Sequence, residues 1–164
     1  REMTNQGGWQ SNDDLHKDER FLEILESISK YFQPLFKKYS YVDDVELYIT
    51  NMWANVNRYK DSNMKHLHGR SDWSWAYYVS VPTGSGNLIF CDPRIRRAMY
   101  QKEELLKNFD SPSQYSEYKI VPSVGKLIIF RDSITLIPRA SRLIQKILSG
   151  NGKKKKRFTK PTWM

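Results

Sequence analysis

Residues 51–94 read NMWANVNRYKDSNMKHLHGRSDWSWAYYVSVPTGSGNLIFCDPR, and His66 and His68 stand at their centre. In an extended strand, side chains two positions apart point to the same side, so both imidazoles can reach one point. Imidazole is a ligand for iron, zinc, copper and nickel. The pair therefore predicts two adjacent ligands of a metal site, while polar residues near a strand end remain the simpler interpretation of the bare pattern. The third ligand stays open.

The histidine pair lies between two predicted strands. Before it, residues 45–59 alternate aliphatic and polar side chains, which is typical of a half-buried strand. Counting onward from the aliphatic residues without a bulge places Asn57 and Tyr59 on the same inward face, near the open end of the strand. After the pair, residues 73–81 are rich in aromatic and β-branched side chains and end at Pro82, which predicts a second strand.

Turn residues divide the region that follows. Residues 83–86 are Thr-Gly-Ser-Gly and predict a tight turn, so residues 87–91 should return as the hairpin partner of strand 73–81. A second hairpin is predicted from residues 115–121 and 126–130. Between the two hairpins, residues 95–114 form a longer excursion with a short helix over 103–108.

A helix is predicted near the N-terminus, after a polar leader of residues 1–18. Apolar residues recur there at three- and four-residue intervals, namely Phe21, Leu22, Ile24, Leu25, Ile28, Tyr31, Phe32, Leu35 and Phe36. Pro34 is expected to kink or end this helix, whose apolar stripe should pack on a sheet. One helix followed by five or more short antiparallel strands predicts a mainly β jelly roll or barrel rather than a βαβ fold.

The net charge of +9 is confined to the C-terminal segment. Of 27 Lys/Arg and 18 Asp/Glu, ten bases and one acid fall in residues 131–164, which leaves 17 of each in residues 1–130. Apolar residues between Ile137 and Leu148 have helical spacing, so this segment predicts a basic amphipathic helix that stops at Gly150. Such a tail could bind nucleic acid or another acidic surface, or could simply be solvated. We therefore divide the chain into segments 1–18, 19–130 and 131–164.

Length and composition set further bounds. With 164 residues the chain is expected to form one domain with a core of its own. The single cysteine, Cys91, excludes an internal disulfide and fits a reducing compartment; we expect it to be a small buried residue rather than a nucleophile. No run approaches the roughly 18 apolar residues of a membrane helix. The first twenty residues contain no apolar signal region, so we expect a cytoplasmic protein.

Several blocks agree in order and spacing with one known family. They are W-x-N-V-N-x-Y, then H-x-H, then the aromatic strand with Tyr77-Tyr78, then V-P-x-x-S-G-N-L-x-F-x-D-P-R, and finally Y-x-I-x-P-x-x-G-K-L-I-I-F. Over about residues 7–130 the chain resembles the iron(II)/2-oxoglutarate-dependent oxygenases of bacteria and marine phages. The resemblance implies a double-stranded β-helix, a jelly roll of the cupin kind.

The resemblance also implies a site. In this family two histidines and usually one carboxylate hold iron(II), which leaves positions open for 2-oxoglutarate and dioxygen. His66 and His68 match the first ligands, with histidine in place of the aspartate of H-x-D. Tyr78 matches a tyrosine that hydrogen-bonds the cosubstrate, and Asn57 and Tyr59 match an N-x-Y motif that contacts 2-oxoglutarate. The implied activity is a dioxygenase that hydroxylates or oxidises an unidentified substrate.

The chain departs from the family pattern directly after Phe130. The family continues with a proline, a distal histidine ligand and, later, an R-x-S arginine that pairs with 2-oxoglutarate, but no histidine follows His68. We hypothesise that residues 131–164 are an alternative-frame or otherwise aberrant ending, so that the roll is incomplete at the C-terminus and turnover is absent. The coding DNA tests this: one of its other two frames after Phe130 should encode a histidine followed by R-x-S, and the hypothesis fails if neither does.

Two other functions stay open from the sequence. One is a cupin-like metal-binding protein that uses His66, His68 and Asp72, since H-x-H-x₃-D approximates the cupin H-x-H-x₃-E. Asp72 is equally compatible with a turn residue that caps the following strand. The other is a non-catalytic binding module whose basic tail docks on an acidic partner.

Overall fold

A computed structural model of the chain describes residues 5–38, 45–67, 71–91, 117–131, 135–138 and 145–156. The position of His68 and the excursion over 95–114, with its predicted helix, lie outside the described residues.

The N-terminal helix forms where the apolar periodicity predicts it. Two short 3-10 turns, η1 (Leu15–Lys17) and η2 (Glu19–Phe21), lead into helix α1 (Leu22–Lys38). Pro34 lies within α1, which continues beyond it, so the proline does not end the helix. No helix among the described residues is long and apolar enough to span a membrane.

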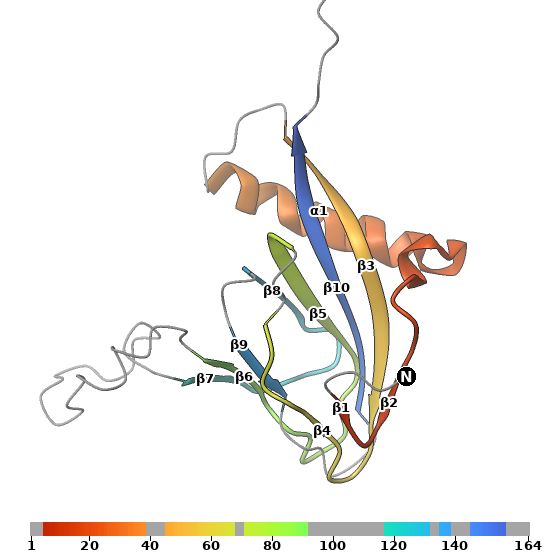
Figure 1. Cartoon of the computed structure of the whole chain (residues 1–164), viewed down its shortest axis with the longest axis vertical. Coiled ribbons are helices and arrows are strands. Elements are labelled where there is room, and N and C mark those ends of the chain that lie inside the picture. The colour runs from red at the N-terminus through yellow and green to blue at the C-terminus, as the bar shows by residue number, and fades with distance from the viewer. Residues whose placement is uncertain are drawn as a thin grey trace, which may run out of the picture.

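The described strands form three antiparallel sheets. The five-stranded sheet has the order β2 (Trp9–Gln10), β3 (Val45–Asn57), β10 (Gln145–Lys156), β5 (Trp73–Ser80) and β8 (Leu127–Arg131). The three-stranded sheet has the order β7 (Glu117–Ile120), β6 (Leu88–Cys91) and β9 (Thr135–Pro138). The short strands β1 (Asn5–Gln6) and β4 (Ser62–Asn63) pair with each other. Figure 1 shows β3, β10 and β5 side by side, with the three-stranded sheet on one side of them and α1 on the other.

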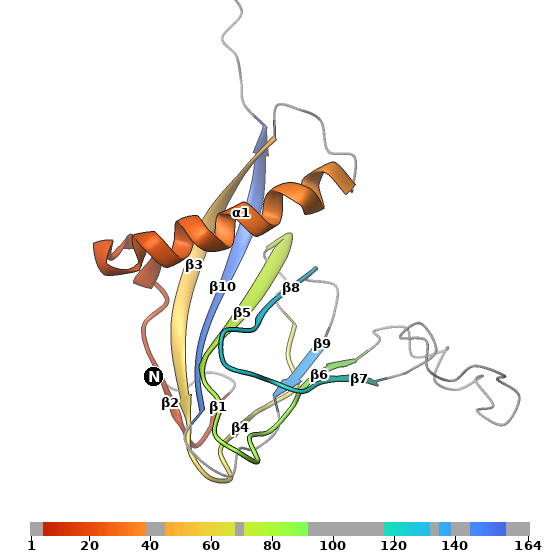
Figure 2. The ribbon, with the colours of Figure 1, turned by 180° about the vertical axis from the view of Figure 1, so that it is seen from behind.

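Helix α1 covers one face of the five-stranded sheet, as Figure 2 shows. The buried apolar side chains between helix and sheet are Leu25, Ile28, Phe32, Met52, Trp73, Trp75 and Leu148. On the opposite face, Phe130 of β8 packs against Leu88 of β6, and its ring meets Phe90 edge-on with centroids 5.1 Å apart. The two larger sheets thus enclose a second core. This arrangement confirms the predicted mainly β jelly roll with an N-terminal helix.

Both predicted hairpins are wrong in their pairing, although their strands form. Strand β6 pairs with β7 and β9 and not with β5, while β8 pairs with β5 and not with β7. The turns therefore carry the chain from one sheet to the other instead of folding it back on itself. In a roll, consecutive strands cross between sheets, and turn residues alone do not distinguish that path from a hairpin.

A β-bulge changes the predicted alternation along β3. Asn51 pairs with Asn151, but the next pair joins Ile49 to Gly152, so the register skips Thr50. Ile49 and Met52 consequently pack together on the helix side, although an odd and an even position should face opposite ways. The prediction that Asn57 shares the face of the aliphatic residues is wrong, because it lies on the face opposite the helix.

The polar leader belongs to the sheet. Strand β2 pairs with β3, and the Ser11 N–H donates to the Ala54 carbonyl at 3.0 Å. In return, the Ala54 N–H donates to Ser11 Oγ at 2.9 Å, and the Met52 N–H donates to the Asp13 carbonyl at 2.9 Å. The N-terminal segment thus extends the large sheet beyond β3.

The predicted C-terminal amphipathic helix is wrong. Residues 135–138 and 145–156 form strands β9 and β10. Strand β10 pairs with β3 on one side, and over residues 146–152 it also pairs with β5 on the other. The spacing of apolar residues within one segment does not show whether two other strands leave a place between them in the sheet. Here, pairing with β3 and β5 decides the conformation. Over residues 135–138 and 145–156, the tail therefore presents no basic helix to an acidic partner. That residues 131–164 derive from another reading frame remains a prediction.

Candidate active site

Polar side chains line the inner face of the large sheet at one end. Gln10 of β2 pairs with Asn55 of β3, Asn55 pairs with Ile147 of β10, and Ile147 pairs with Tyr78 of β5. Directly paired residues on neighbouring strands share a face, and this one lies opposite the face that α1 covers. Gln10, Asn55 and Tyr78 are all buried. One row across four strands therefore places two carboxamides and a phenol inside the roll, and we call it the amide row.

Tyr78 is the most enclosed member of the amide row. Its side chain is 2% exposed and packs with Ala76, Ile128 and Val81. Burial raises the pKa of Tyr78 above its ordinary value, so the phenol is neutral at physiological pH and keeps its O–H donor. The backbone fixes its position, because the Gly125 N–H donates to the Tyr78 carbonyl at 2.8 Å.

Asn57 lies two residues beyond Asn55, on the same face. Its side chain is 2% exposed, and Nδ2 has no hydrogen-bond partner among the described residues. A buried N–H without an acceptor is costly, so such a donor indicates a missing ligand or water. Gly8 approaches it closely: a Cβ at Gly8 would lie 3.0 Å from Asn57 Oδ1. The leader thus closes over this amide.

His66 is half-buried in the segment after β4. Its Nδ1 lies 2.8 Å from the Met64 carbonyl oxygen. A carbonyl only accepts hydrogen bonds, so Nδ1 carries a proton, and in the neutral ring the lone pair is then on Nε2. Metal-bound histidines commonly show this arrangement, in which the second nitrogen donates to a carbonyl and orients the ring. The local structure therefore fits His66 as a ligand through Nε2.

The remaining ligands are not defined by the described residues. Among them, no three His, Cys, Asp or Glu side chains come together as a metal site. His68 lies outside the described residues, so the geometry of the histidine pair remains a prediction. Asp72 is half-buried and lies directly before β5, as expected for either of its two interpretations.

Tyr59 does not lie inside the roll. Its side chain is 61% exposed, and the Lys60 ammonium lies 5.3 Å from the ring centroid. Strand β3 ends at Asn57, and a tight turn follows in which the Asp61 N–H donates to the Arg58 carbonyl at 3.1 Å. The prediction of an inward Tyr59 is wrong, because strand alternation does not continue through this turn.

Cys91 lies at the end of β6, away from any disulfide partner. It is buried, and burial raises the pKa of its thiol. A protonated buried thiol is a poor nucleophile. This agrees with the expected structural role.

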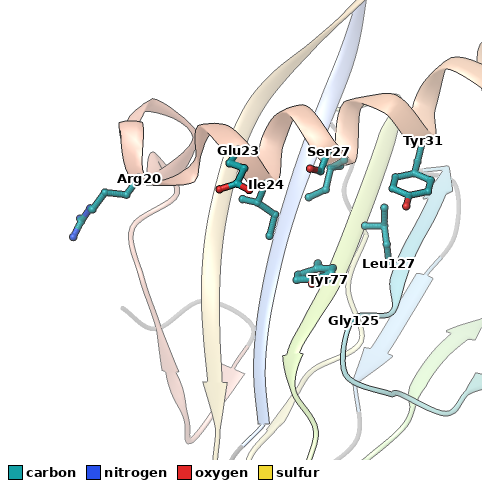
Figure 3. A pocket seen from close by; sticks show the side chains of 9 residues that line it. Arg20, Glu23, Ile24, Ser27, Tyr31, Tyr77, Gly125 and Leu127 are labelled. Atoms are coloured by element: carbon teal, nitrogen blue, oxygen red, sulfur yellow. The ribbon is translucent and has the colours of Figure 1, made fainter.

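A separate pocket of about 420 Å³ lies on the other side of the large sheet. It lies between α1 and the β5–β8 edge, and Figure 3 shows Tyr77 and Leu127 facing the helix residues Ile24 and Tyr31. Arg20 at its rim is paired with Asp18 at 2.6 Å. Since Tyr77 and Tyr78 are consecutive in a strand, this pocket and the amide row lie on opposite faces of β5.

Gln10 and Asn55 were not among the site residues predicted from the sequence. Asn55 stands in the quoted N-V-N pattern, where its spacing from Asn57 predicts a shared face. Gln10 gave no such signal, because a two-residue strand is too short to show alternation. Only its pairing with β3 assigns it to the inner face.

The fold and these residues together define a jelly-roll protein with buried polar side chains on the inner face of its large sheet and a histidine whose Nδ1 faces a backbone carbonyl. Residues 51–135 match the family model of the 2OG-Fe(II) oxygenases, where 2OG is 2-oxoglutarate. This match covers more than half of the chain, and the chain belongs to that family.

Solved structures agree with the fold at low sequence identity. A prolyl-4-hydroxylase of Pseudomonas putida is 12% identical with a TM-score of 0.56, over 90% of this chain and 72% of that one. A viral collagen prolyl hydroxylase of Paramecium bursaria Chlorella virus 1, solved with 2OG, is 11% identical with a TM-score of 0.54, over 91% and 80%. A 2OG-Fe(II) oxygenase family oxidoreductase of Burkholderia pseudomallei is 12% identical with a TM-score of 0.53, and the alignment covers 78% of this chain and 55% of that one. No curated protein matches.

Proposed function

We propose that this chain has the site of an iron(II)/2-oxoglutarate-dependent dioxygenase, a class that hydroxylates or oxidises its substrate, here still to be identified. If residues 131–164 replace the family's distal histidine and cosubstrate arginine, as hypothesised above, the chain binds these ligands without turnover. His66 and His68 are the proposed metal ligands, and Tyr78 and Asn57 are the proposed cosubstrate-binding residues. The observation that carries the proposal is the set of buried, inward-facing polar groups on the amide row and at Asn57, inside the segment that matches the family.

The described residues include hydrogen-bond donors for an oxygen-rich ligand and one histidine suited to a metal. The unpartnered Nδ2 of Asn57 and the neutral phenol of Tyr78 are donors suited to carboxylate or keto oxygens. The Met64 carbonyl faces Nδ1 of His66, an orientation that leaves Nε2 as the ring nitrogen for a metal. When bound, iron(II) would supply oxidation of the substrate by dioxygen, coupled to decarboxylation of 2-oxoglutarate. Tyr59 is left out of the proposed site because it is exposed.

Two kinds of observation in relatives support this assignment. The viral prolyl hydroxylase was solved with 2OG, and the similar structures are described as oxygenases or hydroxylases. Since the chain spans only 55% of the Burkholderia protein, the primary substrate is not carried over from any of them. Substrate choice in such folds depends on loops, which vary more than the sheets.

The test is an anaerobic titration of the protein with iron(II), with and without 2-oxoglutarate. We expect a visible metal-to-ligand charge-transfer band that requires the protein, iron and 2-oxoglutarate together. Iron binding without any band on adding 2-oxoglutarate would contradict the proposal and favour a cupin-like metal protein. Succinate added in place of 2-oxoglutarate is the matched control, because succinate lacks the keto group and should give no band.

A further inference from the structure

We propose that the pocket between α1 and the β5–β8 edge, here called the helix-side pocket, binds an alkylammonium ion. The charge of the ligand lies at the Glu23 carboxylate, and its hydrocarbon chain lies against Tyr77 and Leu127. The pocket has a volume of about 420 Å³, which is within the range of small-molecule sites in proteins. It lies on the helix side of the large sheet and not inside the roll, so this inference is independent of the proposed function.

The helix-side pocket has a polar wall on the helix and a largely apolar floor on the sheet. Glu23, Ser27 and Tyr31 are spaced four residues apart in α1, so they lie in one row along the helix. Below this row, Tyr77 of β5 and Leu127 of β8 are directly paired in the sheet. Figure 3 shows the two groups on opposite sides of the pocket. A ligand between them meets a carboxylate and hydroxyls on one side, and a ring and an aliphatic side chain on the other.

The charges that line the helix-side pocket favour a cation. Glu23 is its acidic lining residue, and the carboxylate makes no hydrogen bond or ion pair with any residue that the structure describes. Arg20 is the basic lining residue, but its guanidinium donates to both carboxylate oxygens of Asp18, at distances of 2.6 to 3.1 Å. Figure 3 shows the Arg20 side chain pointing away from Glu23. The negative charge of Glu23 is therefore left for a ligand.

The surrounding charges add to this preference. Residues 18–29 contain four acids and one base, a net charge of 1 − 4 = −3, in a chain whose net charge is +9. Lys126 lies between the lining residues Gly125 and Leu127, but its ammonium donates to the Val121 carbonyl. Exposed charges act over about 10 Å at moderate ionic strength, so this end of α1 attracts cations and repels anions.

The tyrosines make the helix-side pocket suited to an organic cation rather than to a metal ion. Tyr31 is 64% exposed at the pocket and Tyr77 is half-buried in it. The faces of tyrosine rings attract ammonium groups and also contact hydrocarbon chains. A hard metal ion needs several oxygen ligands, and no three His, Cys, Asp or Glu side chains come together in the part of the chain that the structure describes. An alkylammonium ion uses both the single carboxylate and the rings.

Titration of the full chain with hexylammonium, followed by two-dimensional amide NMR, tests the inference. Hexanol and hexanoate are the matched probes, because they carry the same hydrocarbon chain with no charge and with a negative charge. We expect hexylammonium to bind about tenfold more tightly than hexanol, as for one exposed ion pair with a contact to an aromatic ring. Hexanoate should bind most weakly. The amide signals that shift should be those of Ser27, Gly125 and Leu127, and not those of Asn55 and Asn57 inside the roll.

Two variants connect the affinity with the carboxylate. Glu23→Gln should weaken hexylammonium binding about fivefold and leave hexanol binding unchanged. Glu26→Gln is the matched control, because it removes an acid from the same helix that does not line the pocket, and its affinity should equal that of the wild type. Glu23 lies in the first turn of α1, where an acid also stabilises the helix. Unchanged hexanol affinity excludes this structural effect, because a displaced helix would weaken the binding of every probe.

Three results would overturn the inference. They are equal affinities for hexylammonium and hexanol, an unchanged hexylammonium affinity in Glu23→Gln, and amide shifts confined to residues outside the helix-side pocket. None of them bears on the proposed function, which the titration with iron(II) and 2-oxoglutarate tests separately.

Discussion

Replacing His66 with alanine is expected to abolish iron(II) binding. The Met64 carbonyl already orients this imidazole, so the substitution removes a proposed ligand whose ring orientation is fixed before the metal binds. Loss of a residue that only supports a ligand costs about 10–100-fold in metal affinity, and loss of the ligand itself should exceed that range. Equilibrium dialysis under anaerobic conditions measures the effect, and His68→Ala should reproduce it.

Two control variants make this result specific. His16→Ala removes the third histidine of the chain, which lies in η1, and should leave iron affinity unchanged. Asp72→Ala should also leave it unchanged if the site is of the oxygenase kind, but should abolish binding if Asp72 is a cupin-like third ligand. Retained iron affinity in both His66→Ala and His68→Ala would contradict the assignment of this metal site.

Replacing Gly150 with alanine is expected to lower the stability of the protein substantially. Gly150 is paired with Trp75 on one side and Met52 on the other, and both are fully buried beneath α1. A Cβ at this position would lie 2.6 Å from the Trp75 ring. Overpacking of this kind costs about 1–3 kcal/mol, which corresponds to a fall of roughly 3–10 °C in the thermal midpoint. Thermal unfolding followed by circular dichroism gives the value.

The matched control is Ser149→Ala, the adjacent residue in β10, which points to the other face and gains no volume. Equal midpoints for Gly150→Ala and Ser149→Ala would mean that β10 does not pack beneath Trp75. That outcome would support an aberrant ending that stays outside the roll. A large difference between them would show that residues 145–156 are a structural part of the sheet.

The sequence predicted those elements whose signal is local. Helix α1 and strands β3 and β5 show clear apolar periodicity over many residues, because each buries one face against the same core. His66 and Tyr78 were found from a short motif and a resemblance. His66 lies between two predicted strands and Tyr78 lies within the second of them.

Elements that depend on distant partners could not be predicted. The skipped residue Thr50 reverses the face of every later position in β3, and nothing in the local pattern marks it. Strand β10 has helical spacing but occupies a position created by β3 and β5. Gln10 joins the inner face only through its pairing with Asn55. In each case, the conformation or exposure of a residue was decided by a strand far away in the sequence.

The most direct test of the account is an anomalous diffraction experiment on crystals grown anaerobically with iron(II) and 2-oxoglutarate. We predict one iron peak inside the roll, coordinated by Nε2 of His66 and by His68, with 2-oxoglutarate extending from it toward Asn57 and Tyr78. Imidazoles that point apart on the outer surface, with no iron between them, would contradict the account.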